Sequence, residues 1–391
     1  MKVSKKVVTV TVSLLLMLTL VLAGCAAPKG VNQDSAKNSS KGPIKIGLVT
    51  QLSGGGALYG KLMQQGAQLA VDQANKAGGV LGRKVKLLAE DDQANPSETV
   101  KITQQLVSED NIDAWIGTLK SSDTITDIGI TSKSNIPSLV PVGVADNVMQ
   151  QGYKNAFRNV ANNTMQITEM VNYIIKKQPT KRAAIIAENT DYGRGIATTF
   201  SKLFAKDGRT VTDVEYYNVG QKDFSDQLTK IKAQNPDGIV IAGLVAEGSL
   251  IAKQAKSLGM DQQLYSFGGF MGSQPVALAG SAVEGLIHTD YFVPAAKDAL
   301  TKKFVKDFKA KYGSIPDSYY SAATYDAVNL YLDAVKEAKS TESSKVIKKL
   351  GSFKNKHTVM GNITFDKTGQ AKAKVWISEI KNGKQLGIYH D

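Results

Sequence analysis

Residues 46–75 read "IGLVTQLSGGGALYGKLMQQGAQLAVDQAN", and this stretch decides the fold. An apolar strand-like run is followed by glycines and then by a helix-like run, which is the order of a βα unit. Gly55, Gly60 and Lys61 also have the spacing of a phosphate-binding loop. However, Leu62 stands where such a loop needs Ser or Thr to bind Mg²⁺. The glycines are therefore predicted to form a tight turn that lets the backbone approach a small ligand.

The N-terminal segment has the pattern of a secretion signal. Three lysines are followed by the apolar run VVTVTVSLLLMLTLVLA, which leads into LAGC at residues 22–25. A basic start, a short apolar core and small residues at the cleavage point are typical of a signal peptide. LAGC resembles the lipobox of bacterial lipoproteins, which predicts a signal peptide over 1–24 and a lipid on Cys25. An uncleaved membrane anchor with an incidental cysteine is the alternative.

The next segment is predicted to be a flexible tether. Residues 25–43 are small and polar, so they cannot bury enough apolar surface to fold. Because Cys25 is the only cysteine, no intrachain disulfide can form. Roughly 350 residues follow from Ile44, a length that favours two domains over one.

The basic composition indicates a solvated surface more than a nucleic-acid interface. The chain carries 48 Lys and Arg against 35 Asp and Glu, a formal net charge of +13. Only five of these basic residues are arginines, the residue best suited to bidentate contacts with phosphates and bases. The lysines are dispersed, and in KKFVKDFKAKY (302–312) they occupy the face opposite an aromatic stripe. We therefore expect no nucleic-acid partner, and a surface that faces anionic lipid or cell wall.

Strand-like and helix-like segments alternate along the folded part of the chain. This βαβα order predicts an α/β fold with parallel sheets and helices on both faces. The order breaks near 153–163 and then restarts, which predicts two similar doubly wound lobes. Tyr59-Gly60 and Tyr192-Gly193 occupy the same place in the two halves. Ligands of such sheets bind beyond the carboxyl ends of the strands, so two facing lobes would enclose a ligand between those edges.

The segment WIGTLKSSDT (115–124) predicts an anion site. A strand ends at Gly117 and a helix begins near Ser121 and Ser122. Two hydroxyl groups and the free N–H groups of a helix start are suited to binding a carboxylate. The alternative is that Ser121 only caps the helix.

The sequence gives little support for an enzyme. Its histidines, His288, His357 and His390, are not at helical metal-ligand spacing, and neither H-E-x-x-H nor G-x-S-x-G occurs. We therefore expect no catalytic residues, no metal and no cofactor. A ligand sensor that reports to a membrane receptor and a purely structural surface protein remain open alternatives to a transport receptor.

The chain resembles the Leu/Ile/Val-binding proteins of bacterial ABC importers. The resemblance is carried by residues 44–100 and by GTLKSSDT, NTDYGRG, QKDFSDQL, YSAATYDAV and TVMGNITFDKTGQ, and it extends in order to Gln370. It implies a type I periplasmic-binding fold with two lobes joined by three hinge crossings, near 155–163, 287–294 and 352–362. Lobe 1 would comprise 44–157 with 291–351, and lobe 2 would comprise 158–290 with 352–391. The strands GNITFD and KVWISEI would both belong to lobe 2.

The resemblance also implies a binding site. The ligand carboxylate would lie on Ser121 and on the backbone of Val142 and Gly143, while Tyr59 and Tyr192 would line the cleft. An aromatic residue at the side-chain pocket corresponds to Tyr320. The expected ligand-binding residues are Tyr59, Ser121, Ser122, Val142, Gly143, Val144, Tyr192, Leu244, Glu247, Gly269, Phe270 and Tyr320.

Three positions depart from the family pattern. Val144 replaces a Thr, Leu244 replaces a Tyr, and Gly268-Gly269 stand where an Asp or Glu would pair with the ligand ammonium. A buried ammonium without an opposite charge is costly. Either another acid replaces the missing one, with Glu188, Asp191 and Glu247 as candidates, or the ligand lacks a free ammonium, as an aromatic carboxylate does.

The resulting hypothesis is an extracytoplasmic receptor that is lipid-anchored through Cys25. It would bind a small, hydrophobic amino acid or a related carboxylate by hinge closure, as a monomer, and deliver it to the permease subunits of an ABC importer.

Overall fold

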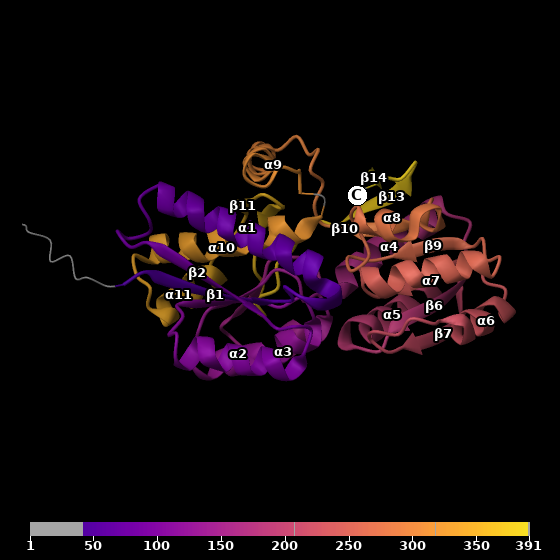
Figure 1. Cartoon of the computed structure of the whole chain (residues 1–391), viewed down its shortest axis with the longest axis horizontal. Helices are drawn as coiled ribbons and strands as arrows, with labels where there is room; N and C mark the ends of the chain where they lie inside the picture. Colours follow the sequence, from indigo (N-terminus) through magenta and orange to yellow (C-terminus); the bar gives the residue numbers. More distant parts are fainter. Residues whose placement is uncertain (1–41, 207, 317, 390–391) are drawn as a thin grey trace, which may run out of the picture. The chain divides into compact units, whose positions relative to one another are not determined.

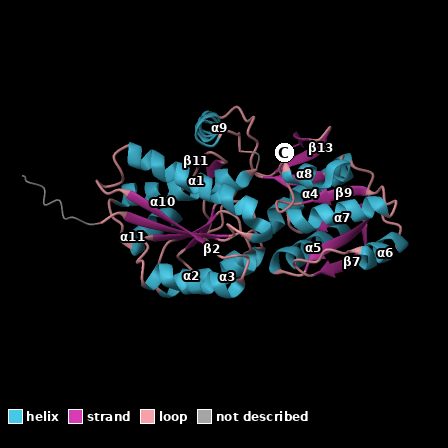
Figure 2. Ribbon diagram, in the orientation of Figure 1, coloured by secondary structure: helices cyan, strands magenta, loops and turns pink. Residues whose placement is uncertain are grey.

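The computed structural model describes residues 42–206, 208–316 and 318–389 (Figure 1). The predicted signal peptide, Cys25 and most of the predicted tether lie outside these residues. The described chain builds two α/β lobes, each around its own sheet, with helices on both faces of the sheet (Figure 2). The expected fold class is therefore confirmed.

The first lobe is built on a five-stranded, entirely parallel sheet in the order β2-β1-β3-β4-β5. Its strands are β1 (Ile44–Thr50), β2 (Val85–Asp91), β3 (Ala114–Gly117), β4 (Ser138–Val140) and β5 (Ala156–Arg158). The helical segments of this part are η1 (Gly54–Gly56), α1 (Ala57–Lys76), α2 (Pro96–Ser108), α3 (Ser121–Lys133), η2 (Asp146–Gln150), α9 (Ala299–Tyr312), α10 (Tyr319–Ala338) and α11 (Ser343–Gly351).

Side-chain alternation along the strands explains why helices cover both faces of this sheet. Ile46 and Leu48 of β1 belong to the core that α1 and α10 share, whereas Val49 packs into a separate cluster with α2 and α3. Figure 1 shows these two helix pairs on opposite sides of β1 and β2. A strand buried on both faces is continuously apolar, as IKIGLVT nearly is.

The second lobe is built on a seven-stranded sheet in the order β14-β13-β10-β9-β8-β6-β7. Its strands are β6 (Arg182–Glu188), β7 (Thr210–Tyr217), β8 (Gly238–Ala242), β9 (Gln263–Ser266), β10 (Ile287–Asp290), β13 (Trp376–Lys381) and β14 (Lys384–Tyr389). Its helices are α4 (Asn163–Lys177), α5 (Asp191–Ala205), α6 (Ser225–Ala233), α7 (Val245–Ser257), α8 (Gln274–Ala279) and η3 (Gly280–Val283).

The C-terminal part of the chain departs from the expected parallel pattern. β13 pairs antiparallel with β10, and β14 pairs antiparallel with β13. Asn382 and Gly383, with φ angles of 52° and 66°, form the two-residue turn between β13 and β14. Asn-Gly is the sequence typical of such a hairpin, so this signal was present in the sequence. The predicted strand GNITFD is also corrected: β12 (Gly361–Ile363) pairs only with β11 (Lys356–Thr358) and does not join the larger sheet.

The chain passes three times between the part built on the first sheet and the part built on the second. The first passage follows β5, the second follows β10, and the third connects β12 to β13. The exact lobe boundaries stay a prediction.

Glycines let α1 approach its neighbours closely. A Cβ atom on Gly60 would lie 1.7 Å from the carbonyl oxygen of Gln51, at the end of β1, and one on Gly66 would lie 2.0 Å from that of Ser321 on α10. The glycine at the matching place in the second lobe, Gly193, has the same role, because its Cβ would lie 2.1 Å from the carbonyl oxygen of Glu188. In both lobes, the glycine of the Tyr-Gly pair therefore lets a helix lie directly against the end of the preceding strand.

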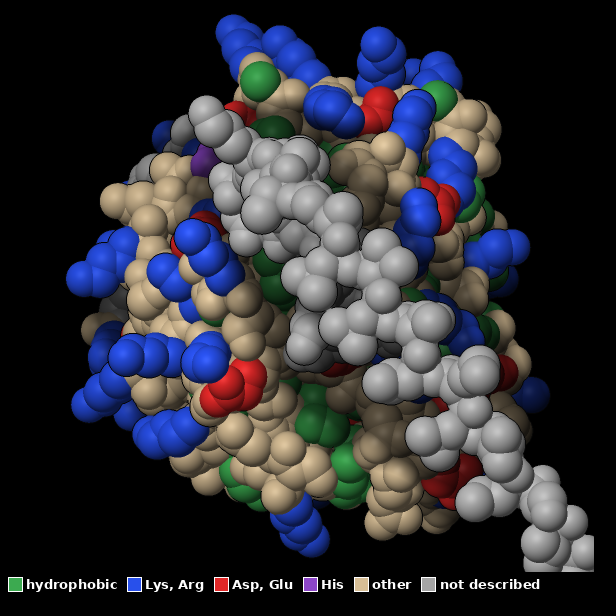
Figure 3. Space-filling model, turned by 90° about the vertical axis from the view of Figure 1, so that its left-hand side faces the viewer, with side chains coloured by type: hydrophobic (Ala, Val, Ile, Leu, Met, Phe, Trp, Pro, Cys, Tyr) green, Lys and Arg blue, Asp and Glu red, His purple; other side chains and the backbone are tan. Residues whose placement is uncertain are grey.

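Basic side chains, lysines and arginines together, are scattered over the visible surface without forming a single patch. Figure 3 shows them spread around one end of the molecule, interrupted by other side chains. Within the described ranges, no helix combines the length and the apolar character that crossing a membrane requires.

Candidate ligand-binding site

A cavity lies at the carboxyl ends of strands from both sheets, as expected for ligands of doubly wound sheets. Its empty space, counted together with the open solvent at its mouth, is about 410 Å³. The first lobe contributes Leu119, Lys120, Ser121, Ser122, Val142, Val144, Tyr319 and Tyr320 to the lining. The second lobe contributes Glu188, Thr190, Tyr192, Leu244 and Gly269.

Most of the residues expected from the sequence meet in this cavity. Those that line it are Ser121, Ser122, Val142, Val144, Tyr192, Leu244, Gly269 and Tyr320. The remaining four do not line it. Tyr59 lies behind Tyr320, and Gly143 packs on Thr124, which a Cβ would meet at 2.7 Å. The Glu247 side chain accepts a hydrogen bond of 2.9 Å from the N–H of Gly220, and the buried Phe270 packs against Gly248.

Ser121 is the first residue of α3, and its side chain faces the next loop of the lobe. Lys120 is the N-cap residue, and no side chain caps this helix, so the alternative of a capping role for Ser121 is wrong. The Ser121 Oγ atom accepts a 3.2 Å hydrogen bond from the N–H of Ala145. Because a hydroxyl group both donates and accepts, Ser121 retains a proton to donate. The first turn of α3 adds backbone N–H groups and the positive end of the helix dipole.

Arg158 fixes the backbone that lies opposite Ser121. Its Nη1 atom donates hydrogen bonds of 2.7 Å to the carbonyl oxygens of both Gly143 and Ala145, and its Nε atom donates to Gln370 Oε1 at 2.6 Å. Complete burial lowers the pKa of the guanidinium to about 10, which still leaves it charged at neutral pH. This role could not be predicted from the sequence, because Arg158 and Gln370 are far apart in the chain and meet only in the folded structure.

The second lobe presents the Gly268-Gly269 pair in the loop after β9, and two side chains hold this loop in place. The Tyr192 hydroxyl accepts a 3.0 Å hydrogen bond from the N–H of Gly269. Gln166 Oε1 accepts from the N–H of Gly268 at 3.2 Å, and also from the hydroxyl groups of Thr289 at 2.9 Å and Tyr291 at 2.7 Å. The loop backbone is thus positioned by α4, α5 and β10 together.

The apolar part of the cavity is larger than the sequence alone indicated. Leu119 and Tyr319 line it in addition to the expected Val144 and Leu244. The Tyr319 and Tyr320 rings stack with centroids 4.4 Å apart. Tyr319 is adjacent to Tyr320 on α10, so the expected role of Tyr320 was a signal that could have identified Tyr319. Leu119 lies in the loop between β3 and α3, where apolar periodicity carries no information.

Glu188 is the acidic residue of the cavity, and it is deeply buried. It is 3% exposed at the end of β6, and its Oε2 atom has no hydrogen-bond partner in the described part of the chain. Burial, and next the charge of Glu247, raise the pKa of Glu188 to about 7. The other two candidate acids lie elsewhere: Glu247 contacts Gly220, and Asp191 accepts a hydrogen bond from Asn147.

The phosphate-loop interpretation finds no support in the structure. Lys61 is exposed on α1, and none of residues 55–61 lines the cavity. In the described ranges, no group of three His, Cys, Asp or Glu is arranged to hold a metal ion. His288 is fully buried in β10, and burial lowers its pKa to about 4, which keeps the ring neutral. Its position is that of a core residue.

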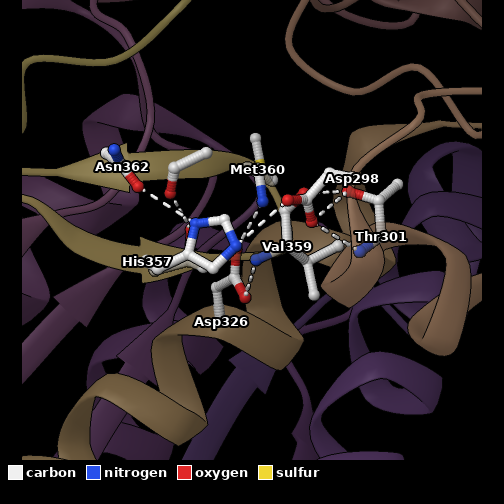
Figure 4. A network of polar contacts seen from close by, with 9 residues as sticks. Asp298, Thr301, Asp326, His357, Val359, Met360 and Asn362 are labelled. Atoms are coloured by element: carbon white, nitrogen blue, oxygen red, sulfur yellow. Dashed lines mark hydrogen bonds and ion pairs between the residues drawn. The ribbon is translucent and has the colours of Figure 1, made fainter.

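A polar network ties β11 and β12 to the helices beside the passages (Figure 4). The buried Asp326 on α10 accepts hydrogen bonds of 3.0 Å from the N–H groups of Val359 and Met360. His357 Nε2 lies 3.0 Å from an oxygen of Asp298, whose other oxygen accepts from the N–H of Thr301. Thr301 donates to the Val359 carbonyl at 2.8 Å. The network joins the start of α9, the middle of α10 and the turn before β12.

Two α/β lobes with a small cavity between the carboxyl ends of their strands define a two-lobed solute-binding fold. The chain belongs to the periplasmic binding protein family, whose family model matches residues 43–385. This family implies an extracytoplasmic location, and its members among the relatives are substrate-binding proteins rather than enzymes.

Relatives and solved structures agree with this assignment. The leucine-, isoleucine-, valine-, threonine- and alanine-binding protein of Pseudomonas aeruginosa is 30% identical over 84% of this chain and 87% of its own length. A leucine-binding protein from Thermotoga maritima superposes with a TM-score of 0.84 at 28% identity, covering 88% of this chain and 98% of that one. A branched-chain amino acid transporter substrate-binding protein from Streptococcus pneumoniae, solved with isoleucine, gives 0.82 at 28% identity with the same coverage.

Proposed function

We propose that this protein is the extracytoplasmic receptor of an ABC importer and that it binds a small, hydrophobic amino acid or related carboxylate. The observation that carries this proposal is the cavity itself. It places the Ser121 hydroxyl and the first turn of α3 on one side and the Leu119, Val144 and Leu244 side chains around the remaining space. An anionic head and an apolar tail satisfy both parts.

Binding proceeds by closure of the lobes around the ligand. The ligand carboxylate docks first on Ser121 and on the backbone of Val142, and Arg158 holds the residues that follow Val142 in place through the carbonyl of Gly143. Tyr192 and the Gly269 loop then contact the ligand from the second lobe. Only a ligand that contacts both lobes stabilises the closed form, which is the form that a permease reads.

The names of the relatives support transport over sensing. The Streptococcus pneumoniae protein is described as part of a branched-chain amino acid transporter, and the Pseudomonas aeruginosa protein as a binder of leucine, isoleucine, valine, threonine and alanine. A sensor could use the same cleft, so the two roles differ in their partners. Co-purification of the membrane-bound chain with permease subunits supports transport, whereas co-purification with a membrane receptor supports sensing.

Calorimetry tests the ligand class and the carboxylate site together. The purified chain is titrated with leucine, isoleucine, valine and benzoate. Ser121→Ala is expected to weaken binding by about 1–3 kcal/mol, because it removes a hydrogen bond to a charged group. Ser134→Ala, at the exposed end of the same helix, is the matched control and is expected to change nothing. An unchanged dissociation constant for Ser121→Ala would remove this residue from the site.

We further propose that Cys25 carries a lipid that anchors the monomeric receptor to the cell membrane. The support is the LAGC sequence after a basic and apolar leader. Cys25→Ser is expected to move the chain from the membrane fraction to the soluble fraction. Retention of this variant in the membrane would favour the alternative, an uncleaved leader.

A further inference from the structure

Glu188 lines the cavity, but the proposed site for the ligand carboxylate gives this residue no role. Its backbone ends β6, and its side chain lines the same space as Ser121, which comes from the other lobe. One carboxylate oxygen, Oε2, is buried without a partner among the described residues. Burying a charged or polar group without a partner is unfavourable, so such a group calls for an explanation, for example a bound ligand or ion.

The charged and titratable groups that face Glu188 come from four neighbouring elements. Glu247 of α7 repels it, Lys120 before α3 attracts it, and Tyr192 of α5 and Tyr217 of β7 are close enough to feel its charge. The Lys120 ammonium donates a hydrogen bond of 3.3 Å to the carbonyl of Ala94, so one of its protons is directed to its own lobe. The contact with Lys120 does not compensate for burial, since the pKa of Glu188 is raised to about 7.

A cation inside the cavity would satisfy this carboxylate. The other lining groups limit what that cation can be. The apolar side chains of Val142, Val144 and Leu244 cannot bind the water shell of a hydrated ion, while Ser121 and the start of α3 favour an anion in the same space. A molecule that carries an ammonium and a carboxylate on one carbon, with an apolar side chain, meets all of these demands.

We propose that Glu188 pairs with the α-ammonium group of the ligand, and that the ligand is therefore an α-amino acid with a free ammonium and an apolar side chain. This inference rests on the proposed function and decides between its two ligand classes. The ammonium contact comes from the end of β6, and Gly268-Gly269 supply no charge at the place where the resemblance led us to expect an acid.

The pairing makes ligand binding depend on pH. An ammonium ion pairs with the ionised Glu188, so binding an amino acid near neutral pH releases a proton from the fraction of the protein in which Glu188 is protonated. The affinity should rise as the pH increases from about 6 to about 8, through the pKa of about 7. A carboxylate ligand without an ammonium has no such partner, and its affinity should not rise in this interval.

The experiment compares ligand pairs that differ only in the ammonium. L-leucine and 4-methylpentanoate are titrated into the wild-type chain, into Glu188→Gln and into Glu215→Gln, which makes the same charge change on β7 beside Lys230 and outside the cavity. Glu188→Gln is expected to weaken L-leucine binding at least tenfold and to leave 4-methylpentanoate binding unchanged. Retained binding of 4-methylpentanoate also shows that the variant is folded.

Several outcomes would overturn the inference, and they can be told apart from failure of the proposed function. Equal L-leucine affinity for Glu188→Gln and the wild type overturns the role of Glu188. Tighter wild-type binding of 4-methylpentanoate than of L-leucine shows a ligand without an ammonium, which overturns the inference but leaves a carboxylate receptor. Binding of neither molecule, nor of isoleucine or valine with their matched acids, overturns the proposed function itself. A pH profile for L-leucine that is flat from 6 to 8 also counts against the pairing.

Discussion

The rings of Tyr59 and Tyr320 stack with centroids 4.2 Å apart and planes 14° from parallel, and both hydroxyl groups reach across to the second lobe. Tyr59 donates to the carbonyl of Met271 at 3.0 Å, and Tyr320 donates to the carbonyl of Gly268 at 3.1 Å. Tyr320 lines the cavity, whereas Tyr59 lies behind it. The pair therefore connects the lobes at the side of the ligand site, through the loop that also carries Gly269.

The first prediction concerns this connection. Tyr59→Phe and Tyr320→Phe keep the stacked rings but remove one hydrogen bond each between the lobes. Each is expected to weaken ligand binding by about 0.5–1.5 kcal/mol, mainly through faster dissociation. Stopped-flow and calorimetric measurements check this. Tyr331→Phe on the same helix is the control, because its buried hydroxyl has no hydrogen-bond partner in the part of the chain that the structure describes. An equal loss in the control would contradict the prediction.

The second prediction concerns the close approach at Gly269. A Cβ atom there would lie 2.8 Å from the Gly243 carbonyl oxygen, 2.9 Å from the Tyr192 hydroxyl and 3.0 Å from Leu244. Overpacking of this kind costs about 1–3 kcal/mol, so Gly269→Ala is expected to weaken ligand binding by roughly tenfold or more.

Gly55→Ala is the matched control, since a Cβ there meets nothing within 4 Å. Calorimetry measures both variants, and circular dichroism checks that each is folded. Undiminished affinity of Gly269→Ala would show that the loop does not contact the ligand.

The third prediction concerns Arg158, whose side chain joins the carbonyls of Gly143 and Ala145 to Gln370. Arg158→Met removes these hydrogen bonds and leaves buried carbonyl groups without partners. We expect the free energy of unfolding to fall by roughly 3 kcal/mol or more, because each hydrogen bond to a charged group contributes about 1.5–3 kcal/mol.

Chemical denaturation measures this change. Arg182→Met is the control, because the exposed Arg182 also donates to two backbone carbonyls, at the exposed end of β6. Its substitution is expected to cost less than about 1 kcal/mol, since water can satisfy those carbonyls. Equal losses in the two variants would mean that burial of Arg158 is not the reason for its effect.

The fourth prediction concerns pH and the buried Asp127 of α3. Thr99 donates to it at 3.1 Å, and burial raises the pKa of its carboxyl to about 8. The unfolded chain has a pKa near the ordinary value of about 3.9, so between pH 4 and pH 8 the folded state binds more protons. The contribution of Asp127 to stability therefore falls as the pH rises through this interval.

Asp127→Asn, which mimics the protonated acid, should remove this dependence. We expect the variant to match the wild type near pH 4.5 and to be more stable by several kcal/mol at pH 8.5, since each unit of pKa shift corresponds to about 1.4 kcal/mol of stability. Urea unfolding at the two pH values measures the difference. A variant that is less stable by the same amount at both values would show that the carboxylate is required in its ionised form.

The order of elements was predictable because it depends on local pattern. The apolar run before Gly55 and the helix after it, the cap at Asn95 followed by Pro96, and the Tyr-Gly pairs all carry their information within a few residues. The cap is observed, with Asn95 accepting a hydrogen bond from the N–H of Ser97. The antiparallel pairing of β13 and β14 differs from the expectation that both sheets are parallel throughout. The Asn382-Gly383 pair indicates this hairpin in the sequence.

The sequence by itself determined two βα halves, the glycines at their turns and a serine at a helix start. These are local properties of propensity, periodicity and backbone freedom. Only the tertiary structure decided that Arg158 holds the loop opposite Ser121 and that Glu188, rather than Glu247 or Asp191, lines the cavity. The neighbours of these side chains depend on which strand ends face one another in the folded chain. Their pKa values depend on burial, which exists only after the sheets have formed.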